Sequence, residues 1–250
     1  MTNLASQRLQ ASHGGTKVFP KVNGTGLVIF AGRFGSGKTE IALNYAVRLA
    51  ETRATGGGAP ILVDLDIVTP YFRTRELAAA MEARGVEVIA PPELTRSVDV
   101  PAITPQILGA IEQTSRPVVV DVGGDPHGAK VLGQYRNAVQ RRGYTLYFVV
   151  NPFRPYTATP EAIRDSVREI ESTSHLKASS LVSNPNLIKE TTSESVREGH
   201  AVVEAAAHLL GLPVAFVVVW HNVLGDLTAD DLPAGLPVMS LSRYFTLPWE

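Results

Sequence analysis

A glycine-rich segment, GRFGSGKT from Gly32 to Thr39, has the residue types and spacing to hold the phosphates of a nucleotide. It matches the phosphate-loop pattern G-x-x-x-x-G-K-[ST] in full. Its glycines permit positive φ and a close approach of backbone N–H groups to phosphate oxygens. Lys38 can reach the β- and γ-phosphates, and the Thr39 hydroxyl can coordinate Mg²⁺. The segment predicts a nucleotide site with Mg²⁺, against the alternative of an ordinary glycine turn.

Carboxylates that can complete such a site follow two strand-like runs. Asp121 lies near the end of the apolar run VVVDV and forms a D-x-x-G segment with Gly124. We expect Asp121 to hold Mg²⁺ through water and the Gly124 N–H to contact the γ-phosphate, because open α/β sheets bind ligands at the carboxyl ends of their strands. Asp64 and Asp66 end the run ILVDLD, and they share a face if the strand continues through both. Asp66 is the candidate that orients the attacking water; for each aspartate, a cap on the next element is the alternative.

The elements that must position these residues alternate along the chain between apolar runs and segments of helical periodicity. The predicted strands are 26–32, 59–66, 86–90, 116–124, 144–151, 178–184 and 213–223, and the predicted helices are 38–51, 73–85, 104–114, 129–142, 159–172 and 193–211. This alternation predicts a three-layer α/β fold, with a mostly parallel, twisted sheet and helices on both faces. We expect a flexible polar leader over residues 1–16 and one nucleotide-binding domain over residues 17–250.

Composition narrows the function classes. The chain has no cysteine, which excludes a thiolate nucleophile and a Cys-ligated zinc site or iron–sulfur cluster held by one chain. The net charge of −1 gives no global attraction to nucleic acid or to an anionic membrane. No apolar run approaches the roughly 18 residues of a membrane helix, and Arg243 is the only Lys or Arg after Gly211. We therefore expect a cytoplasmic protein without a membrane anchor or a DNA-binding surface.

Four segments together resemble one branch of the P-loop ATPases. The phosphate loop, VDLDI, DVGG and LVSNPN resemble the MinD/ParA-like branch, within the SIMIBI class that also includes CobQ/CobB-type nucleotide-binding domains. The resemblance covers most of residues 25–220. It implies ATP and Mg²⁺ as cofactors, a homodimer that closes around ATP, a catalytic role for Lys38 and Asp66, and a switch role for Asp121. It also implies that Asn184 reads the adenine edge, although an asparagine after a strand is often a turn residue.

Departures from the family's G-K-G-G-x-G-K-T loop are informative. Arg33 occupies the position of the signature lysine, which in the family reaches across the nucleotide-bridged homodimer. Its forked donors suggest a catalytic arginine finger acting on phosphate, with action across the dimer as the candidate and action within its own chain as the alternative. Phe34 replaces a glycine and is expected to point outward, toward a partner. Glu40 replaces a second Ser or Thr, so we expect its carboxylate to turn away while its backbone N–H serves the nucleotide. The predicted nucleotide-binding residues are Gly32, Arg33, Phe34, Gly35, Ser36, Gly37, Lys38, Thr39, Glu40, Gly124 and Asn184, and the predicted metal ligands are Thr39, Asp66 and Asp121.

Three functions fit this pattern. The first is a nucleotide-switched dimeric ATPase that acts on a protein partner, and the absence of any N-K-x-D-type string favours ATP over GTP. The second is a CobQ/CobB-like ATP-dependent ligase or a small-molecule kinase, with Arg73, Arg75 or the proline-rich stretch 90–105 holding a substrate. The third, an ATPase that positions cargo on DNA or a membrane surface, lacks the basic C-terminal segment that it would need.

Overall fold

The computed structural model describes residues 26–52, 58–66, 75–90, 104–113, 115–227, 231–232 and 235–244. The predicted leader, Arg73 and the proline-rich stretch 91–103 lie outside these ranges, as does the side chain of Arg75. Within the described ranges, no helix combines the length and apolar character needed to cross a membrane.

One parallel sheet forms the centre of the molecule, with the strand order β3-β2-β4-β1-β5-β6-β7-β8. The strands are β1 (Leu27–Gly32), β2 (Ile61–Leu65), β3 (Glu87–Ile89), β4 (Val118–Val122), β5 (Thr145–Val150), β6 (Ser180–Ser183), β7 (Val214–Trp220) and β8 (Val238–Leu241). Every residue of β1, β2, β4 and β5 is buried, as expected for parallel strands that are covered on both faces. The predicted three-layer α/β fold with a parallel sheet is confirmed.

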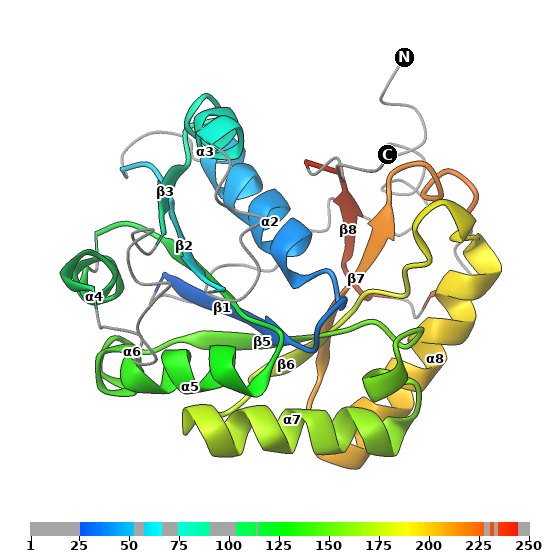
Figure 1. Cartoon of the computed structure of the whole chain (residues 1–250). Coiled ribbons are helices and arrows are strands. Elements are labelled where there is room, and N and C mark those ends of the chain that lie inside the picture. Colours follow the sequence, from blue (N-terminus) through cyan, green and yellow to red (C-terminus); the bar gives the residue numbers. More distant parts are fainter. Residues whose placement is uncertain are drawn as a thin grey trace.

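Helices cover both faces of this sheet unequally (Figure 1). One face carries α2 (Lys38–Thr52) and α3 (Arg75–Glu82), and the other carries α4 (Pro105–Glu112), α5 (Pro126–Gln134), α6 (Arg136–Arg142), α7 (Pro160–Ser174) and α8 (Ser193–Leu210). Two short 3-10 helices, η3 (Pro155–Thr157) and η4 (Ile188–Glu190), lie in the connections after β5 and β6. In β1, Val28 and Phe30 pack toward α2, while Leu27 and Ile29 pack in the opposite core. The alternation of side chains along β1 thus builds two separate cores.

Two elements differ from the sequence prediction. The helix predicted over 129–142 starts at Pro126, where Asp125 caps it by accepting the Gly128 N–H at 2.8 Å, and it is divided at Tyr135 into α5 and α6. The sequence analysis also missed β8, which pairs in parallel with β7 at the edge of the sheet. Its short run VMSL lies beyond a segment rich in proline and glycine, so its apolar signal is weak.

The chain after β8 returns to α2. Asn44 donates through Nδ2 to Ser242 O at 2.7 Å and accepts the Ser242 N–H at 2.9 Å. Tyr244 donates its backbone N–H to Glu40 Oε2 at 3.1 Å, and its ring lies 5.1 Å from the Arg84 guanidinium carbon. The C-terminal segment therefore covers the first turns of α2 as far as Tyr244.

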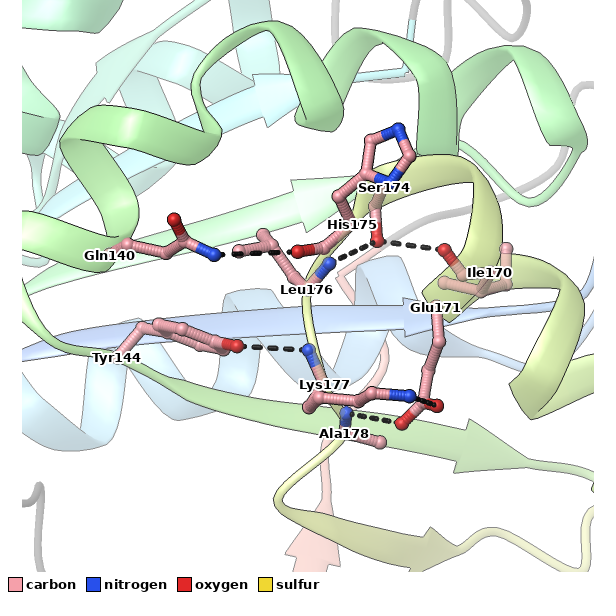
Figure 2. Close-up of polar contacts among 9 residues, drawn as sticks. All are labelled: Gln140, Tyr144, Ile170, Glu171, Ser174, His175, Leu176, Lys177 and Ala178. Carbon is pink, nitrogen blue, oxygen red and sulfur yellow. Dashed lines mark hydrogen bonds and ion pairs between the residues drawn. The ribbon is translucent and has the colours of Figure 1, made fainter.

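The connection from α7 to β6 is held by a set of polar contacts (Figure 2). Glu171 accepts the Ala178 N–H at 3.0 Å and pairs with Lys177 Nζ at 2.6 Å. The Tyr144 hydroxyl accepts the Lys177 backbone N–H at 2.9 Å. This connection enters β6 at the amino ends of the strands, and its contacts fix the C-terminal end of α7 opposite the phosphate loop.

Candidate nucleotide-binding site

The phosphate loop joins β1, the middle of the sheet, to the N-terminus of α2. Gly37 has φ +85, and a Cβ there would overlap the Asn184 side-chain nitrogen, so this position requires glycine. The loop turns through a bond from Ser36 N to Arg33 O at 3.1 Å, and α2 starts with Ile41 N donating to Gly37 O at 3.1 Å. The loop thus opens directly onto a helix N-terminus, which favours an anion.

At the end of the loop, Thr39 lies between the buried Lys38 and the buried Asp121, and the three form a polar group. Thr39 Oγ1 donates to Asp121 Oδ2 at 2.6 Å, while Asp121 Oδ1 has no hydrogen-bond partner among the described residues. Burial raises the pKa of the Asp121 carboxyl to about 6; Lys38 and the Thr39 hydrogen bond oppose this rise, and Asp66 adds to it. A buried carboxylate with a free oxygen beside a hydroxyl is a donor set that suits Mg²⁺.

The predicted Mg²⁺ ligands can be compared with the groups of acidic and His side chains elsewhere in the described residues. Within the described residues, no group of three or more His, Cys, Asp or Glu side chains could hold a metal ion by itself. Mg²⁺ at nucleotide sites takes only one or two protein carboxylates and completes its coordination with phosphates and waters. Thr39 and Asp121, with Asp66 nearby, therefore fit an ion that binds together with a nucleotide.

Asp64 lies on β2, beside the strand that carries Asp121, and Asp66 follows directly after β2. Asp64 is opposite Asp121 in the register of β2 and β4. The strand ends at Leu65, and the Asp66 backbone N–H donates to Asp64 Oδ1 at 2.8 Å. The condition for a shared face, a strand continuing through both residues, is not met. Asp64 fixes the turn, and this places Asp66 at the carboxyl edge of the sheet.

Gly124 packs directly against the phosphate loop. A Cβ at this position would lie 2.7 Å from Phe34 N and 2.9 Å from Lys38 Nζ. A side chain would therefore displace the loop or the lysine amine. The neighbouring Gly123 lies close to the Asp66 carboxylate, since a Cβ there would be 3.3 Å from Asp66 Oδ1. The D-x-x-G segment thus brings Asp121 and Gly124 beside Lys38. The predicted contact of the Gly124 N–H with the γ-phosphate stays a prediction.

Asn184 also reaches the loop, from the end of β6. Its Nδ2 donates to Ser36 O at 2.7 Å, and its Oδ1 and the Ser36 hydroxyl have no partner among the described residues. The side chain is buried against the loop backbone. Asn184 therefore supports the phosphate loop in this structure, and its role as an adenine reader stays a prediction.

The unusual residues of the loop point away from its centre. Glu40 directs its carboxylate to the Tyr244 N–H, as expected for a side chain that must leave the phosphate path. Phe34 is 68% exposed, in agreement with the prediction that it points outward.

Arg33 contacts helix α7 of its own chain. Its Nε donates to Ser166 Oγ at 3.0 Å, its Nη2 forms an ion pair with Glu169, and its guanidinium carbon lies 5.4 Å from the centre of the Tyr156 ring. The predicted arginine finger is thus engaged on α7, and its predicted action on phosphate would require these contacts to break.

A second arginine at the loop was missed by the sequence analysis. Arg154, in the connection after β5, donates through Nε to Gly35 O at 3.2 Å. The signal for it was faint: an arginine in N-P-F-R-P, just after a central strand. With Lys38 and Arg33, it makes the loop a site where positive groups gather, although the net charge of the chain is −1.

Comparisons with known proteins bear on the fold. No family model matches the sequence, and no curated protein matches it. Among solved structures, the signal recognition particle receptor FtsY from Elizabethkingia anophelis in complex with GDP is 15% identical, with a TM-score of 0.51 over 88% of this chain and 65% of the receptor. FtsY from Mycoplasma mycoides is 15% identical, with a TM-score of 0.54 over 91% and 72%. The cell division protein FtsY from Thermotoga maritima is 16% identical, with a TM-score of 0.50 over 80% and 63%.

These likenesses concern the fold. The chain shares the three-layer α/β P-loop NTPase fold of these receptors. It spans less than two thirds of the length of the Elizabethkingia and Thermotoga receptors. These likenesses agree with the predicted fold, and the SIMIBI class and its MinD/ParA-like branch stay predictions.

Proposed function

We propose that this protein is a Mg²⁺-dependent ATPase, related to the MinD/ParA-like proteins, that dimerises when ATP is bound and acts on a protein partner. The observation that carries the proposal is the contact between Asp121 and Thr39, the last residue of a complete phosphate loop. It joins the two segments that a phosphoryl-transfer site needs, the loop that holds phosphate and the strand end that holds metal.

Each residue of this site has a task in hydrolysis. Lys38 neutralises charge on the phosphates. A Cβ on Gly124 would lie 2.9 Å from the Lys38 amine, so the Gly124 backbone is beside it, and we propose that the Gly124 N–H contacts the same phosphate. Thr39 and Asp121 would hold Mg²⁺, which supplies charge neutralisation when bound. Asp66 orients the attacking water and accepts its proton, from the strand end next to Asp121.

The proposed nucleotide is ATP, and GTP is its competitor. The sequence has no N-K-x-D-type guanine reader, which favours ATP. The Elizabethkingia receptor of the same fold was solved with GDP, so GTP is the competing nucleotide to test. Competition of ATP and GTP for the wild-type protein decides between them.

A dimer formed on the face of the phosphate loop is supported by the side chains exposed there. Phe34 and Tyr156 are 68% and 67% exposed, and Arg33 lies over the Tyr156 ring. Aromatic residues and arginine are the types that concentrate at the centres of protein interfaces. Because Phe34, Tyr156 and Arg33 lie around the nucleotide site, the docking of a second copy on this face would depend on which nucleotide is bound.

The test measures phosphate release from ATP and the molar mass of the protein in solution. Wild-type protein should release phosphate from ATP in the presence of Mg²⁺, and its molar mass should double with ATP in an Asp66→Ala variant that cannot hydrolyse it. A monomeric molar mass with ATP, with ADP and in the Asp66→Ala variant would contradict the proposed dimerisation. Phosphate release that appears only when a small metabolite is added would favour the kinase or ligase function instead.

A further inference from the structure

We propose that Arg154, acting within its own chain, is the arginine that contacts the phosphates of the bound nucleotide and stabilises the transition state. This inference rests on the proposed function and assigns to that site a residue that the phosphate-loop pattern does not contain. Arg154 follows β5, which neighbours β1 in the sheet, and its Nε donates to Gly35 O at 3.2 Å. A Cβ on Gly35 would lie 3.2 Å from the same Nε, so the guanidinium sits directly on the loop.

The turn that carries Arg154 is braced by Asn151. The Asn151 side chain donates to Asn186 O at 2.9 Å and accepts the Phe153 N–H at 3.1 Å. Its backbone O accepts the Thr157 hydroxyl at 2.6 Å and the Arg154 N–H at 3.2 Å. These bonds tie the turn to the segment after β6 and to η3. The backbone of Arg154 is therefore preorganised, which is the property that makes a charged donor effective in catalysis.

Packing against α8 restrains the same turn. A Cβ on Gly199 would lie 2.9 Å from Pro152 Cγ and 3.2 Å from Phe153 Cε2, so the helix backbone and the turn are in close contact. Pro152 and Pro155 flank Arg154 at a distance of at most two residues and restrict φ on both sides. Because the backbone of this turn is restrained, little backbone freedom is lost when the Arg154 guanidinium lies at the loop.

The guanidinium keeps donors available for a ligand. Nε is occupied by Gly35 O, and within the described residues neither Nη atom makes a hydrogen bond or ion pair. The nearby Glu169 is paired with Arg33. Two Nη groups in one plane match two oxygens of a phosphate, a geometry that lysine does not offer. An anion in the loop is the ligand that suits them.

Arg33 is in the opposite condition. Its Nε and Nη2 are bound to Ser166 and Glu169, and its face lies on Tyr156. Arg33 would have to break these contacts before it could touch phosphate, whereas Arg154 needs no such rearrangement. The structure therefore favours Arg154 as the phosphate-contacting arginine of the resting chain.

The step that Arg154 assists is the attack of water on the γ-phosphorus. The new bond joins the water oxygen to phosphorus, and the bond from phosphorus to the bridging oxygen breaks. ADP leaves with that electron pair, and the water proton passes toward Asp66. Arg154 donates to phosphate oxygens on the Gly35 side of the loop, where it offsets the negative charge that develops.

The experiment compares Arg154→Gln, Arg154→Lys and Arg33→Gln with wild type in single-turnover ATP hydrolysis and in ATP and ADP binding. Arg141→Gln is the matched control, because Arg141 is an exposed arginine paired with Glu112 far from the loop. We expect Arg154→Gln to slow the chemical step on the order of 100-fold, with a much smaller loss of ADP affinity. Arg154→Lys should recover only part of the rate, and Arg141→Gln should match wild type.

Guanidinium ion added at low millimolar concentration to an Arg154→Ala variant gives a second readout. Partial recovery of its rate, without recovery in Lys38→Ala, supports direct action of the guanidinium rather than a folding defect. A rate for Arg154→Gln within threefold of wild type, or a larger loss in Arg33→Gln, would overturn the inference while leaving the ATPase itself intact. A wild-type protein that neither binds nor hydrolyses nucleotide would overturn both.

Discussion

The two flanks of the phosphate loop carry opposite kinds of side chain. On the side of β4 and β2, the strand ends present the carboxylates of Asp121 and Asp66. On the side of β5 and β6, they present Arg154 and the amide of Asn184. The strand order places the loop between these flanks, so a metal can be bound on one and phosphate oxygens on the other.

The flanks also differ in burial. Asp64 and Asp121 are fully buried, and Thr39 and the Asp66 backbone contact them directly. Arg154 sits on a turn, and its bond to the loop is exposed. Substitutions on the acidic flank should therefore affect folding as well as chemistry, whereas those at Arg154 should affect chemistry alone. This difference can be tested on each flank.

The largest effect is expected on the acidic flank, for Asp66→Asn. The amide cannot accept the proton of the attacking water, so we expect hydrolysis to fall by about 1,000-fold while ATP binding is largely kept. Single-turnover phosphate release and equilibrium ATP binding measure the two quantities. Asp125→Asn is the control, because Asp125 caps α5 on the same side of the sheet without touching the loop. An Asp66→Asn variant with the wild-type rate would remove Asp66 from the mechanism.

The next prediction concerns pH and Asp121. Its folded pKa of about 6 lies above its ordinary value of 3.8, so between these values the folded chain holds a proton that the unfolded chain has lost. The unfolding free energy of the metal-free protein should therefore fall as pH rises through this window. Asp121→Asn stays neutral, and between about pH 4 and pH 7 it should gain on the order of 2 kcal/mol relative to wild type. Urea unfolding at several pH values measures this, and a stability difference independent of pH would contradict it.

On the basic flank, Asn184→Ala should act on the loop through its backbone. The substitution leaves Ser36 O without its donor in a buried setting, at a cost of about 1–3 kcal/mol. We expect about a tenfold loss of nucleotide affinity together with a lower melting temperature. Titration of nucleotide and a thermal melt measure both effects. Loss of affinity for ATP but not GTP, with stability unchanged, would instead indicate a role in reading the base.

The smallest effect is expected for Glu169→Gln. This change removes the ion-pair partner of Arg33 and leaves Arg154 in place. If Arg154 is the phosphate-contacting arginine, hydrolysis should stay within about threefold of wild type, because an exposed ion pair contributes little to stability. Steady-state phosphate release at several protein concentrations is the measurement. An increase of tenfold or more would show that α7 restrains an arginine finger at Arg33.

Asp121 and Asp66 on the acidic flank and Asn184 on the basic flank could be identified from sequence as candidates, whereas Arg154 could not, for a physical reason. Asp121 and Asp66 end apolar runs, so the pattern that predicts a buried strand also places its carboxylate at the sheet edge. Arg154 is positioned by a turn that Asn151 holds, in part through its bond to Asn186 O in a distant segment after β6. The contacts of Arg33 with Ser166 and Glu169 likewise depend on how α7 packs. Contacts between segments that are distant in the sequence cannot be predicted from local sequence patterns.

In the fold as well, features that depend on contacts between distant segments were not predicted. Long, continuous apolar strands such as β1 and β4 were predicted within a few residues of their observed bounds. The short edge strand β8 was missed, and the division between α5 and α6 at Tyr135 lay inside one periodic segment. Both depend on tertiary packing rather than on periodicity.

The most direct test of the account is Mg²⁺-dependent phosphate release from ATP and GTP by wild type and by Lys38→Ala, measured side by side. We predict release by wild type only with Mg²⁺, faster from ATP than from GTP, and background release by the variant. Equal rates for wild type and Lys38→Ala, or no binding of either nucleotide by wild type, would contradict the assignment of this loop as a nucleotide site.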